Sequence, residues 1–197
     1  MTKQNPLKFI AAIALVSVLF SYGCILNPES GPPDVPPIEI DWPELTDKEA
    51  VIETISLVYE HYRQGSDELI EHYTTVLYED PNDNHDYVWN MQEGDIIEGH
   101  NPIMLRDEDI QGTRFIIENA SALTLDISAG AWNPIPDVCE ECWETTRTYT
   151  ISAKMFIGGE DMTFNGNNMR VNFVVGPNEQ VPGTWTIYIA SDLPGTN

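Results

Sequence analysis

The spacing of apolar residues changes once along the chain, from a helical period to an alternating one. Between residues 46 and 77 apolar residues recur every three or four positions, which is typical of amphipathic helices. The first helix is expected to begin at Thr46, in a capping box with Glu49, and the second at Ser66. Residues 63–65 supply a tight turn between them. The apolar sets are Val51, Ile55, Val58, Tyr59 and Tyr62 in the first helix, and Leu69, Ile70, Tyr73 and Leu77 in the second.

The next stretch carries weaker signals. Residues 80–84 have a strong turn sequence, and residues 87–89 are either a buried anchor or a short strand. Asn101 followed by Pro102 is able to start a third helix. Its apolar residues would be Ile103, Met104, Leu105 and Ile110.

From Ser121 onward apolar and polar residues alternate, which is the pattern of half-buried strands. Turn sequences at Gly158 and Gly159, and at residues 177–183, separate these strands. Helices followed by consecutive strands predict an α+β domain, with N-terminal helices packed on one face of a curved antiparallel sheet. The alternating sets are Leu123, Leu125 and Ile127; Tyr149, Ile151, Ala153 and Met155; Met169, Val171, Phe173 and Val175; and Trp185, Ile187 and Ile189.

The N-terminus has the layout of an export signal. Lys3 and Lys8 precede an uncharged, mostly apolar run at residues 9–20, which is too short to span a bilayer comfortably. Gly23 stands directly before Cys24, and Pro/Gly/Ser-rich sequence follows at once. The arrangement resembles a bacterial lipoprotein signal, in which Cys24 is acylated and becomes the mature N-terminus.

This resemblance implies a division of the chain into three parts. Residues 1–23 would be a lipoprotein signal peptide, residues 24–45 a Pro-rich tether, and residues 46–197 the folded domain. Acyl chains on Cys24 would make the membrane a partner and place the protein in the cell envelope. Because Ile25 is not acidic, sorting to the outer membrane is favoured. An N-terminus that is merely disordered would have the same kind of sequence. The two interpretations differ only in whether Cys24 is modified.

The charge of the chain is strongly negative. It carries 32 acidic against 9 basic residues, with a formal net charge of −23 at pH 7. Such a surface repels phosphate backbones and anionic headgroups, so nucleic acid is not expected as a partner and charge alone would not attach the protein to lipid.

Cys139 and Cys142 remain as a Cys-x-x-Cys pair, which could be a structural disulfide, a redox motif or half of a metal site. Redox chemistry requires a lowered thiol pKa, whereas neighbouring acidic residues raise the pKa of a thiol. A zinc site needs two further ligands, and the sequence has no second Cys pair or clustered His pair. A local disulfide that closes a loop is therefore the favoured interpretation. The acidic neighbours are Asp137, Glu140, Glu141 and Glu144.

A second metal hypothesis concerns calcium. The alternating oxygen ligands of a calcium loop are matched by Asp80, Asn82, Asn84 and Asp86. However, the position of the usual glycine is His85, and Met91 stands where a bidentate acid is expected. A polar turn is the simpler interpretation of this segment.

Several motifs resemble those of the nuclear transport factor 2-like (NTF2-like) superfamily, also called SnoaL-like. The order of predicted elements agrees over residues 46–193. The resemblance implies a cone-like, cystatin-like roll, in which helices and a curved sheet commonly enclose a pocket for a small ligand or for catalysis. The matching motifs are Tyr59-Glu60-His61-Tyr62; Leu69, Tyr73 and Leu77 leading through Asp80-Pro81 to Trp89; and residues 183–192, which read G-x-W-x-I-x-x-x-x-D.

The resemblance also suggests pocket residues, for which Tyr73, Trp89, Trp185 and Asp192 are the candidates. Large aromatic residues more often fill a core than line a cavity, and this applies also to Tyr59, Tyr62, Trp132 and Trp143. Enzymatic members of the superfamily use an Asp or an Asp–His pair in the pocket. None of the histidines lies on a strand predicted to face it. They are His61, His72, His85 and His100.

The sequence therefore favours a lipid-anchored, non-catalytic module that binds an unidentified small ligand or serves as an accessory domain, without a cofactor. One alternative is a SnoaL-like isomerase or hydrolase-type enzyme that uses a pocket carboxylate, and another is a calcium-binding surface protein. Many relatives form a homodimer through the open sheet face. A dry interface of that kind is disfavoured if the outer face is polar. The residues expected there are Thr148, Thr150, Ser152 and Lys154.

Overall fold

The computed structural model describes residues 38–81, 86–92 and 101–194. The predicted signal peptide, Cys24, Asn82, Asn84, His85 and His100 lie outside the described residues. The helices are α2 (Lys48–Glu60), α3 (Ser66–Val76) and α4 (Arg106–Asn119). The strands are β1 (Val88–Asn90), β2 (Ile103–Leu105), β3 (Ala120–Ile127), β4 (Asn133–Pro134), β5 (Trp143–Ile157), β6 (Glu160–Pro177) and β7 (Trp185–Leu193).

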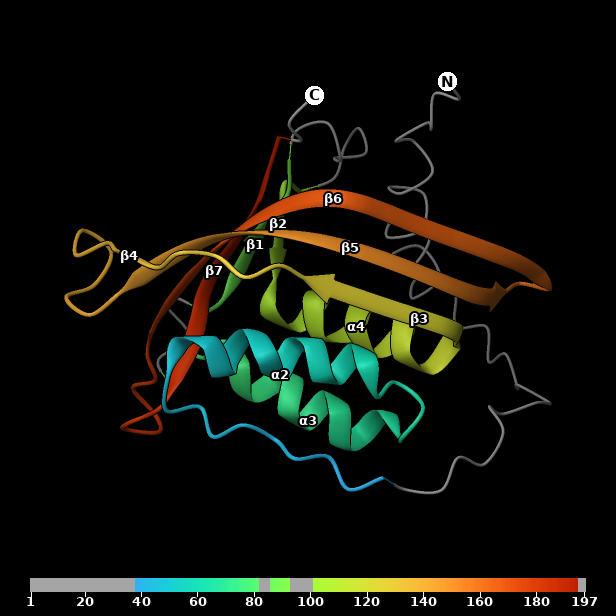
Figure 1. Cartoon of the computed structure of the whole chain (residues 1–197), viewed down its shortest axis with the longest axis horizontal. Helices are drawn as coiled ribbons and strands as arrows, with labels where there is room; N and C mark the ends of the chain where they lie inside the picture. Colours follow the sequence, from blue (N-terminus) through green and yellow to red (C-terminus); the bar gives the residue numbers. More distant parts are fainter. Residues whose placement is uncertain (1–37, 82–85, 93–100, 195–197) are drawn as a thin grey trace.

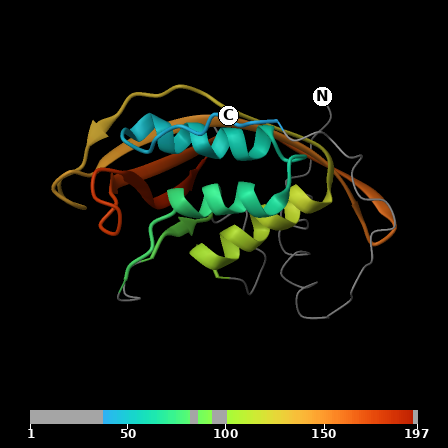
Figure 2. The same ribbon diagram turned by 90° about the horizontal axis from the view of Figure 1, so that it is seen from below.

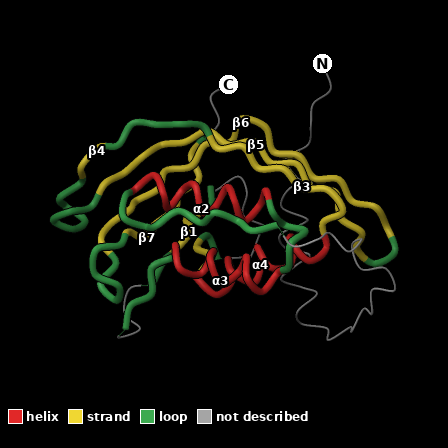
Figure 3. Tube along the Cα trace, turned by 60° about the horizontal axis from the view of Figure 1, so that its bottom comes forward, coloured by secondary structure: helices red, strands yellow, loops and turns green. Residues whose placement is uncertain are grey.

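The described strands form one sheet in the order β2-β1-β7-β6-β5-β3, with β4 paired to β5. Helices α2, α3 and α4 lie on the concave side of this sheet, which arches over them (Figures 1 and 3). Figure 2 shows the three helices side by side from below. The predicted α+β architecture, with helices packed on a curved sheet, is confirmed.

The sheet is mixed rather than antiparallel throughout, which corrects one detail of the prediction. Strand β1 runs parallel to β7, with Val88 opposite Ile189 and Asn90 opposite Ser191. The short segment after α3 enters the sheet in the same direction as the last strand, and Leu77 also bridges Ile187 in parallel. The other strand pairs are antiparallel.

The curvature comes from two long strands and a bulge. Strands β5 and β6 are 15 and 18 residues long. Tyr149 pairs with Met169 but Ile151 pairs with Gly166, so β6 has one extra residue at this point. Asn168 takes up the left-handed conformation there, with φ of 52°. A bulge of this kind bends its strand and increases the local twist.

The core lies between the concave face and the helices. On β5 the buried Ile151, Ala153 and Met155 alternate with residues on the opposite, outer face. That outer face is polar, as expected: Lys154 is exposed, and Thr148, Thr150 and Ser152 are partly exposed. Side-chain hydrogen bonds also run across it, from Asn90 Nδ2 to Ser191 Oγ (3.0 Å), from Thr146 Oγ1 to Asn172 Oδ1 (3.1 Å) and from Asn172 Nδ2 to Glu144 Oε2 (3.1 Å).

The helix starts differ from those predicted. Asp47, not Thr46, is the N-cap of α2, because its carboxylate accepts hydrogen bonds from the backbone N–H groups of Glu49 and Ala50. Helix α3 includes Ser66 and is preceded by Gly65, whose φ of 127° suits glycine.

The third helix begins later than predicted. Ile103–Leu105 form strand β2, which pairs with β1, and α4 starts at Arg106. Glu108 accepts a hydrogen bond from the backbone N–H of Leu105 (2.9 Å), which fixes this start. Pro102 therefore precedes a strand and not a helix.

The folded part also begins before Thr46. Ile40, Trp42 and Leu45 pack against the core, although they fall in the stretch predicted to be a tether. The carbonyl oxygen of Leu45 accepts a hydrogen bond from the backbone N–H of Trp185 (2.7 Å), and the Trp42 ring stacks on His72 at 3.8 Å. Within the described residues, none of the helices has the length and apolar character needed to cross a membrane.

Candidate functional site

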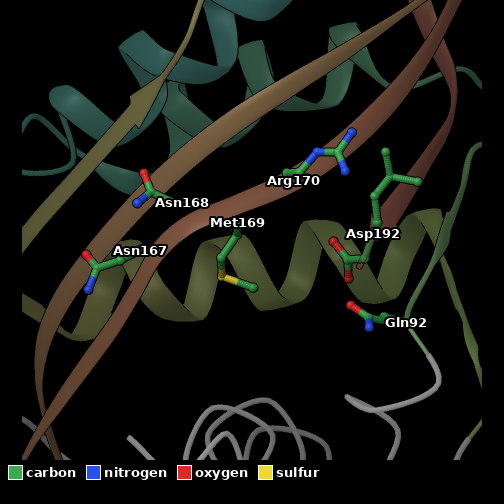
Figure 4. A pocket seen from close by; sticks show the side chains of 7 residues that line it. Gln92, Asn167, Asn168, Met169, Arg170 and Asp192 are labelled. Carbon is green, nitrogen blue, oxygen red and sulfur yellow. The ribbon is translucent and has the colours of Figure 1, made fainter. Parts of the chain in front are cut away.

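A pocket of about 190 Å³ lies where β6 bends and β7 ends (Figure 4). Its polar lining consists of Gln92, Asn167, Asn168, Arg170 and Asp192, and its apolar lining of Met169 and Leu193. Among the described residues, the lining is dominated by amide groups, with one carboxylate and one guanidinium group.

Three elements position these side chains. The bulge in β6 places Asn167 and Asn168 beside Met169. Asp192 pairs with Val171, which is buried, so the Asp192 side chain projects from the concave face. Gln92 follows β1, the neighbour of β7. The pocket therefore depends on the bulge and on the parallel pairing of β1 with β7.

The two charged groups of the lining project from opposite faces of the sheet. Figure 4 shows Met169 and Asp192 on one side of the ribbon and the Arg170 guanidinium on the other. Arg170 pairs with Leu193, one position along from the Val171–Asp192 pair, and its Nη1 donates to the carbonyl oxygen of Pro194 (3.5 Å). Among the described residues, the side of the pocket on which Asp192 lies thus presents its carboxylate together with the amide of Gln92, which suits hydroxyl or amine groups of a small polar molecule.

Of the predicted pocket residues, only Asp192 lines this pocket. Trp185 begins β7 and Asp192 lies seven residues further along the strand, which corresponds to about 23 Å. Trp89 pairs with Ala190 and packs against the core. Tyr73 is buried among the helices. None of these three aromatic side chains lines the pocket at Asp192; Tyr73 is buried, whereas Trp89 and Trp185 are partly exposed at the edge of the core.

The interior holds a second carboxyl that the sequence analysis missed. Asp109, on α4, is only 5% exposed. Its Oδ2 accepts a hydrogen bond from the Tyr73 hydroxyl (3.0 Å), and the Tyr87 side chain is also hydrogen-bonded to it. Tyr59 and Thr113 share a hydrogen bond of 3.3 Å nearby. A polar cluster therefore joins α2, α3, α4 and the residue before β1.

Burial dominates the acid–base properties of this cluster. It raises the pKa of Asp109 to about 6, and the hydrogen bonds from Tyr87 and Tyr73 oppose part of this shift. Burial also raises the pKa of Tyr59 to about 12 and that of Tyr73 well above 10. The carboxyl can change its charge near neutral pH, but it is enclosed by the core.

The described histidines do not complete an acid–base pair with either carboxyl. His61 follows the end of α2, and His72, on α3, stacks on Trp42. Neither residue lines the pocket at Asp192.

The calcium hypothesis falls partly outside the described residues, because it includes Asn82 and Asn84. Of the other two candidates, Asp86 accepts a hydrogen bond through Oδ1 from the backbone N–H of Asp80 (2.7 Å). This contact closes a turn. Over residues 38–81, 86–92 and 101–194, no group of three or more metal-binding side chains comes together.

Cys139 and Cys142 form a disulfide between β4 and β5. The backbone N–H of Cys142 also donates to the carbonyl oxygen of Cys139 (3.1 Å), and that of Ile135 donates to the carbonyl oxygen of Cys142 (2.9 Å). The bridge therefore lies within a tight, hydrogen-bonded loop.

A search for related proteins found matches among solved structures only; no family model and no curated protein matched the chain. An NTF2-like protein of unknown function in nutrient uptake from Rhodospirillum rubrum is 11% identical, with 74% of this chain and 96% of the other covered and a TM-score of 0.48. An NTF2-like superfamily protein from Salmonella enterica is 14% identical, with coverages of 76% and 94% and a TM-score of 0.45.

The fold is similar to that of NTF2-like proteins. A further match is a hexachlorocyclohexane dehydrochlorinase, at 9% identity, with 74% of this chain and 85% of the other covered and a TM-score of 0.44. At such identities the likeness to NTF2-like proteins concerns the fold alone, so the chemistry of this chain has to be argued from its own residues.

Proposed function

We propose that this protein is a non-catalytic, extracytoplasmic binding module for a small polar solute, and that a lipid on Cys24 anchors it to the membrane. The proposal rests on one observation, which is the polar pocket where Asp192 projects from the concave face of the sheet. Export and anchoring are supported by the sequence of residues 1–24, which resembles a lipoprotein signal.

The size of the pocket limits the ligand. A cavity of about 190 Å³ is smaller than the roughly 300–1,000 Å³ typical of sites for drug-sized molecules. It suits a solute of the size of an amino acid or a monosaccharide. The amides of Asn167, Asn168 and Gln92 offer both donors and acceptors, and Asp192 accepts from hydroxyl or ammonium groups.

Binding is favoured over acid–base catalysis by the composition of the two candidate sites. The described lining of the pocket contains a single carboxylate and lacks a histidine. Asp109 has the raised pKa that a general acid or base needs, but substrate cannot reach a carboxyl enclosed by Tyr73 and Tyr87 without opening the core. An isomerase or hydrolase-type enzyme is therefore the second choice.

Isothermal titration calorimetry against a panel of amino acids and monosaccharides tests the proposal. We expect at least one compound to bind the mature chain, and Asp192→Ala to weaken its binding by about tenfold or more, equivalent to about 1.4 kcal/mol. Asp126→Ala is the matched control, because Asp126 is an exposed carboxylate on β3, away from the pocket. An Asp192→Ala variant that binds like the unaltered protein would contradict the proposal, as would a panel in which nothing binds.

A further inference from the structure

Three tryptophan rings surround a single ammonium group at the opposite end of β7 from the pocket. Lys48 Nζ lies 4.4 Å from the ring centroid of Trp143, 4.9 Å from that of Trp185 and 6.0 Å from that of Trp132. Lys48 is the first residue of α2, and the rings come from the segment before β4, from β5 and from β7. We call Trp132, Trp143 and Trp185 the tryptophan cage.

The cage is held in place by its surroundings. Trp132 Nε1 donates to Glu49 Oε2 (3.1 Å), and the Arg147 guanidinium lies 5.2 Å from the centroid of the Trp132 ring. Arg147 is only 1% exposed and binds Glu49 through two hydrogen bonds of 3.0 and 2.7 Å. Its hydrogen bond lowers the pKa of Glu49, so the carboxylate that orients Trp132 stays charged.

The other two rings are fixed by the sheet. Trp143 is paired with Pro134 on one side and with Val175 on the other. Trp185 is paired with Pro177, and its backbone N–H donates to Leu45. All three cage residues are partly exposed, so solvent reaches the site.

The rings, not a carboxylate, hold the ammonium group. Within the described part of the chain, Lys48 has no ion pair, although the protein carries 32 acidic residues. The face of an indole ring attracts a cation, and three faces around one charge are the arrangement that recognises alkylated ammonium ions. The net charge of −23 also raises the local concentration of cations around the protein.

We infer that the tryptophan cage is a binding site for a quaternary ammonium group, and that Lys48 occupies it when the ligand is absent. A quaternary ammonium ion is less strongly hydrated than the ammonium of lysine, so it loses less on leaving water and its methyl groups contact the rings. The lysine side chain is flexible and withdraws into solvent when the ligand enters. This inference does not depend on the pocket at Asp192.

Titration with tetramethylammonium chloride and with choline chloride, followed by NMR of the tryptophan indole N–H groups, tests the inference. We expect the signals of Trp132, Trp143 and Trp185 to shift, and those of Trp42 and Trp89 to stay in place as internal controls. Sodium chloride at equal ionic strength corrects for screening. Cosedimentation with vesicles of phosphatidylcholine or phosphatidylethanolamine measures binding to a lipid headgroup. Comparison with the NMR titration of free choline distinguishes a lipid headgroup from a free solute.

Two substitutions make the test specific. Lys48→Met removes the internal occupant and should tighten binding of tetramethylammonium by about tenfold, whereas Lys154→Met, at an exposed position on β5, should leave it unchanged. Trp143→Leu should abolish binding, with a thermal melt to establish that the variant is folded. The inference is wrong if neither the unaltered protein nor Lys48→Met binds the probe. It is also wrong if only Lys48→Met binds, because the cage would then serve its own lysine alone.

Discussion

Asp109 is a carboxyl placed in the core with tyrosine hydroxyls as partners instead of a cation. The Tyr73 hydroxyl donates to it at 3.0 Å, and Tyr87 is hydrogen-bonded to it as well. These hydrogen bonds favour the ionised form, but the cost of burying the charge is larger, and the pKa rises to about 6. Asp109 therefore makes the stability of the fold depend on pH in a direction opposite to that of most carboxylates.

We predict that Asp109→Asn removes this pH dependence. The pKa in the folded state, about 6, lies above the ordinary value of 3.8. Below about pH 4 Asp109 is protonated in the folded protein and does not lower the free energy of unfolding. That free energy then falls as the pH rises from about 4 through 6. The loss between pH 4 and 7 should be about 2 kcal/mol. Urea denaturation of the unaltered protein and of Asp109→Asn at several pH values measures the difference.

The matched control for this experiment is Asp107→Asn, an exposed carboxylate on the same helix. Its stability relative to the unaltered protein should not rise by a comparable amount between pH 4 and 7. If the free-energy difference between the unaltered protein and Asp109→Asn stayed constant over that range, the buried carboxyl would not titrate as described.

The role of Asp109 could not be predicted from its immediate sequence. It lies in an acidic first turn with Asp107 and Glu108, which reads as a solvated helix start. The available signal was the spacing of Asp109, Thr113 and Ile117, which share one face at intervals of four residues and are all buried. A polar residue on such a face is recognised only when the neighbouring helices are known.

At the scale of elements, the alternation of apolar residues predicted the long strands. Leu123 and Ile151 lie on β3 and β5 as expected, and the two-glycine turn at Gly158 and Gly159 has positive φ values of 61° and 89°. The short strands could not be predicted in the same way. Three residues, as in β1, carry no measurable period, and the helix signal at Pro102 was stronger than the strand signal in Ile103–Leu105.

The two candidate sites also differ in how far the sequence predicted them. Asp192 was suggested by the resemblance of residues 183–192 to a motif of NTF2-like proteins, and it lies near the end of β7. The tryptophan cage and Lys48 bring together residues that are up to 137 positions apart, counted from Lys48 to Trp185. Such a cluster is created by tertiary packing: the three tryptophans were considered among the aromatic residues of the core or a cavity, but nothing in the sequence pattern placed them around Lys48.

Alanine substitutions at two glycines are predicted to change the stability of the protein in opposite directions. Gly112 lies within α4 and a methyl group there would have nothing within 4 Å, so Gly112→Ala should stabilise the protein by about 0.5–1 kcal/mol. At Gly130 a Cβ atom would lie 2.7 Å from the backbone oxygen of Thr146 and 2.9 Å from Thr145 Oγ1. Gly130→Ala should therefore destabilise it by about 1–3 kcal/mol.

Urea unfolding curves of the two variants measure these changes against the unaltered protein. Each substitution serves as the control for the other, since both exchange the same two residues. Equal effects of the same sign would mean that the close approach of residue 130 to β5 is not as described.

At the scale of the whole molecule, the acidic body and the proposed anchor have opposite effects on membrane attachment. A net charge of −23 repels anionic lipids, so stable attachment would depend on the acyl chains at Cys24. On the outer face of the sheet, Asn90 is hydrogen-bonded to Ser191 and Asn172 to Glu144, so many of its polar groups are paired within the protein; Phe156 is a large apolar side chain exposed on the same face.

We predict that Cys24→Ser releases the protein from membranes. The unaltered protein, expressed in bacteria, should partition into the detergent phase of Triton X-114 and carry a lipid by mass spectrometry, because each buried CH₂ contributes about 0.8 kcal/mol. Cys139→Ser is the matched control and should keep the lipid. An unmodified Cys24, or an intact initiator methionine, in the unaltered protein would refute the anchoring.

The position of β7 has a consequence for the timing of folding. This final strand lies between β1 and β6, and its pairing with β1 joins Val88 to Ile189. A chain made from its N-terminus onward cannot complete the sheet until Trp185–Leu193 have emerged, and contacts between such distant residues form slowly. Until that point β1 and β6 lack the strand that joins them, so the sheet stays divided into two parts while the preceding residues are synthesised.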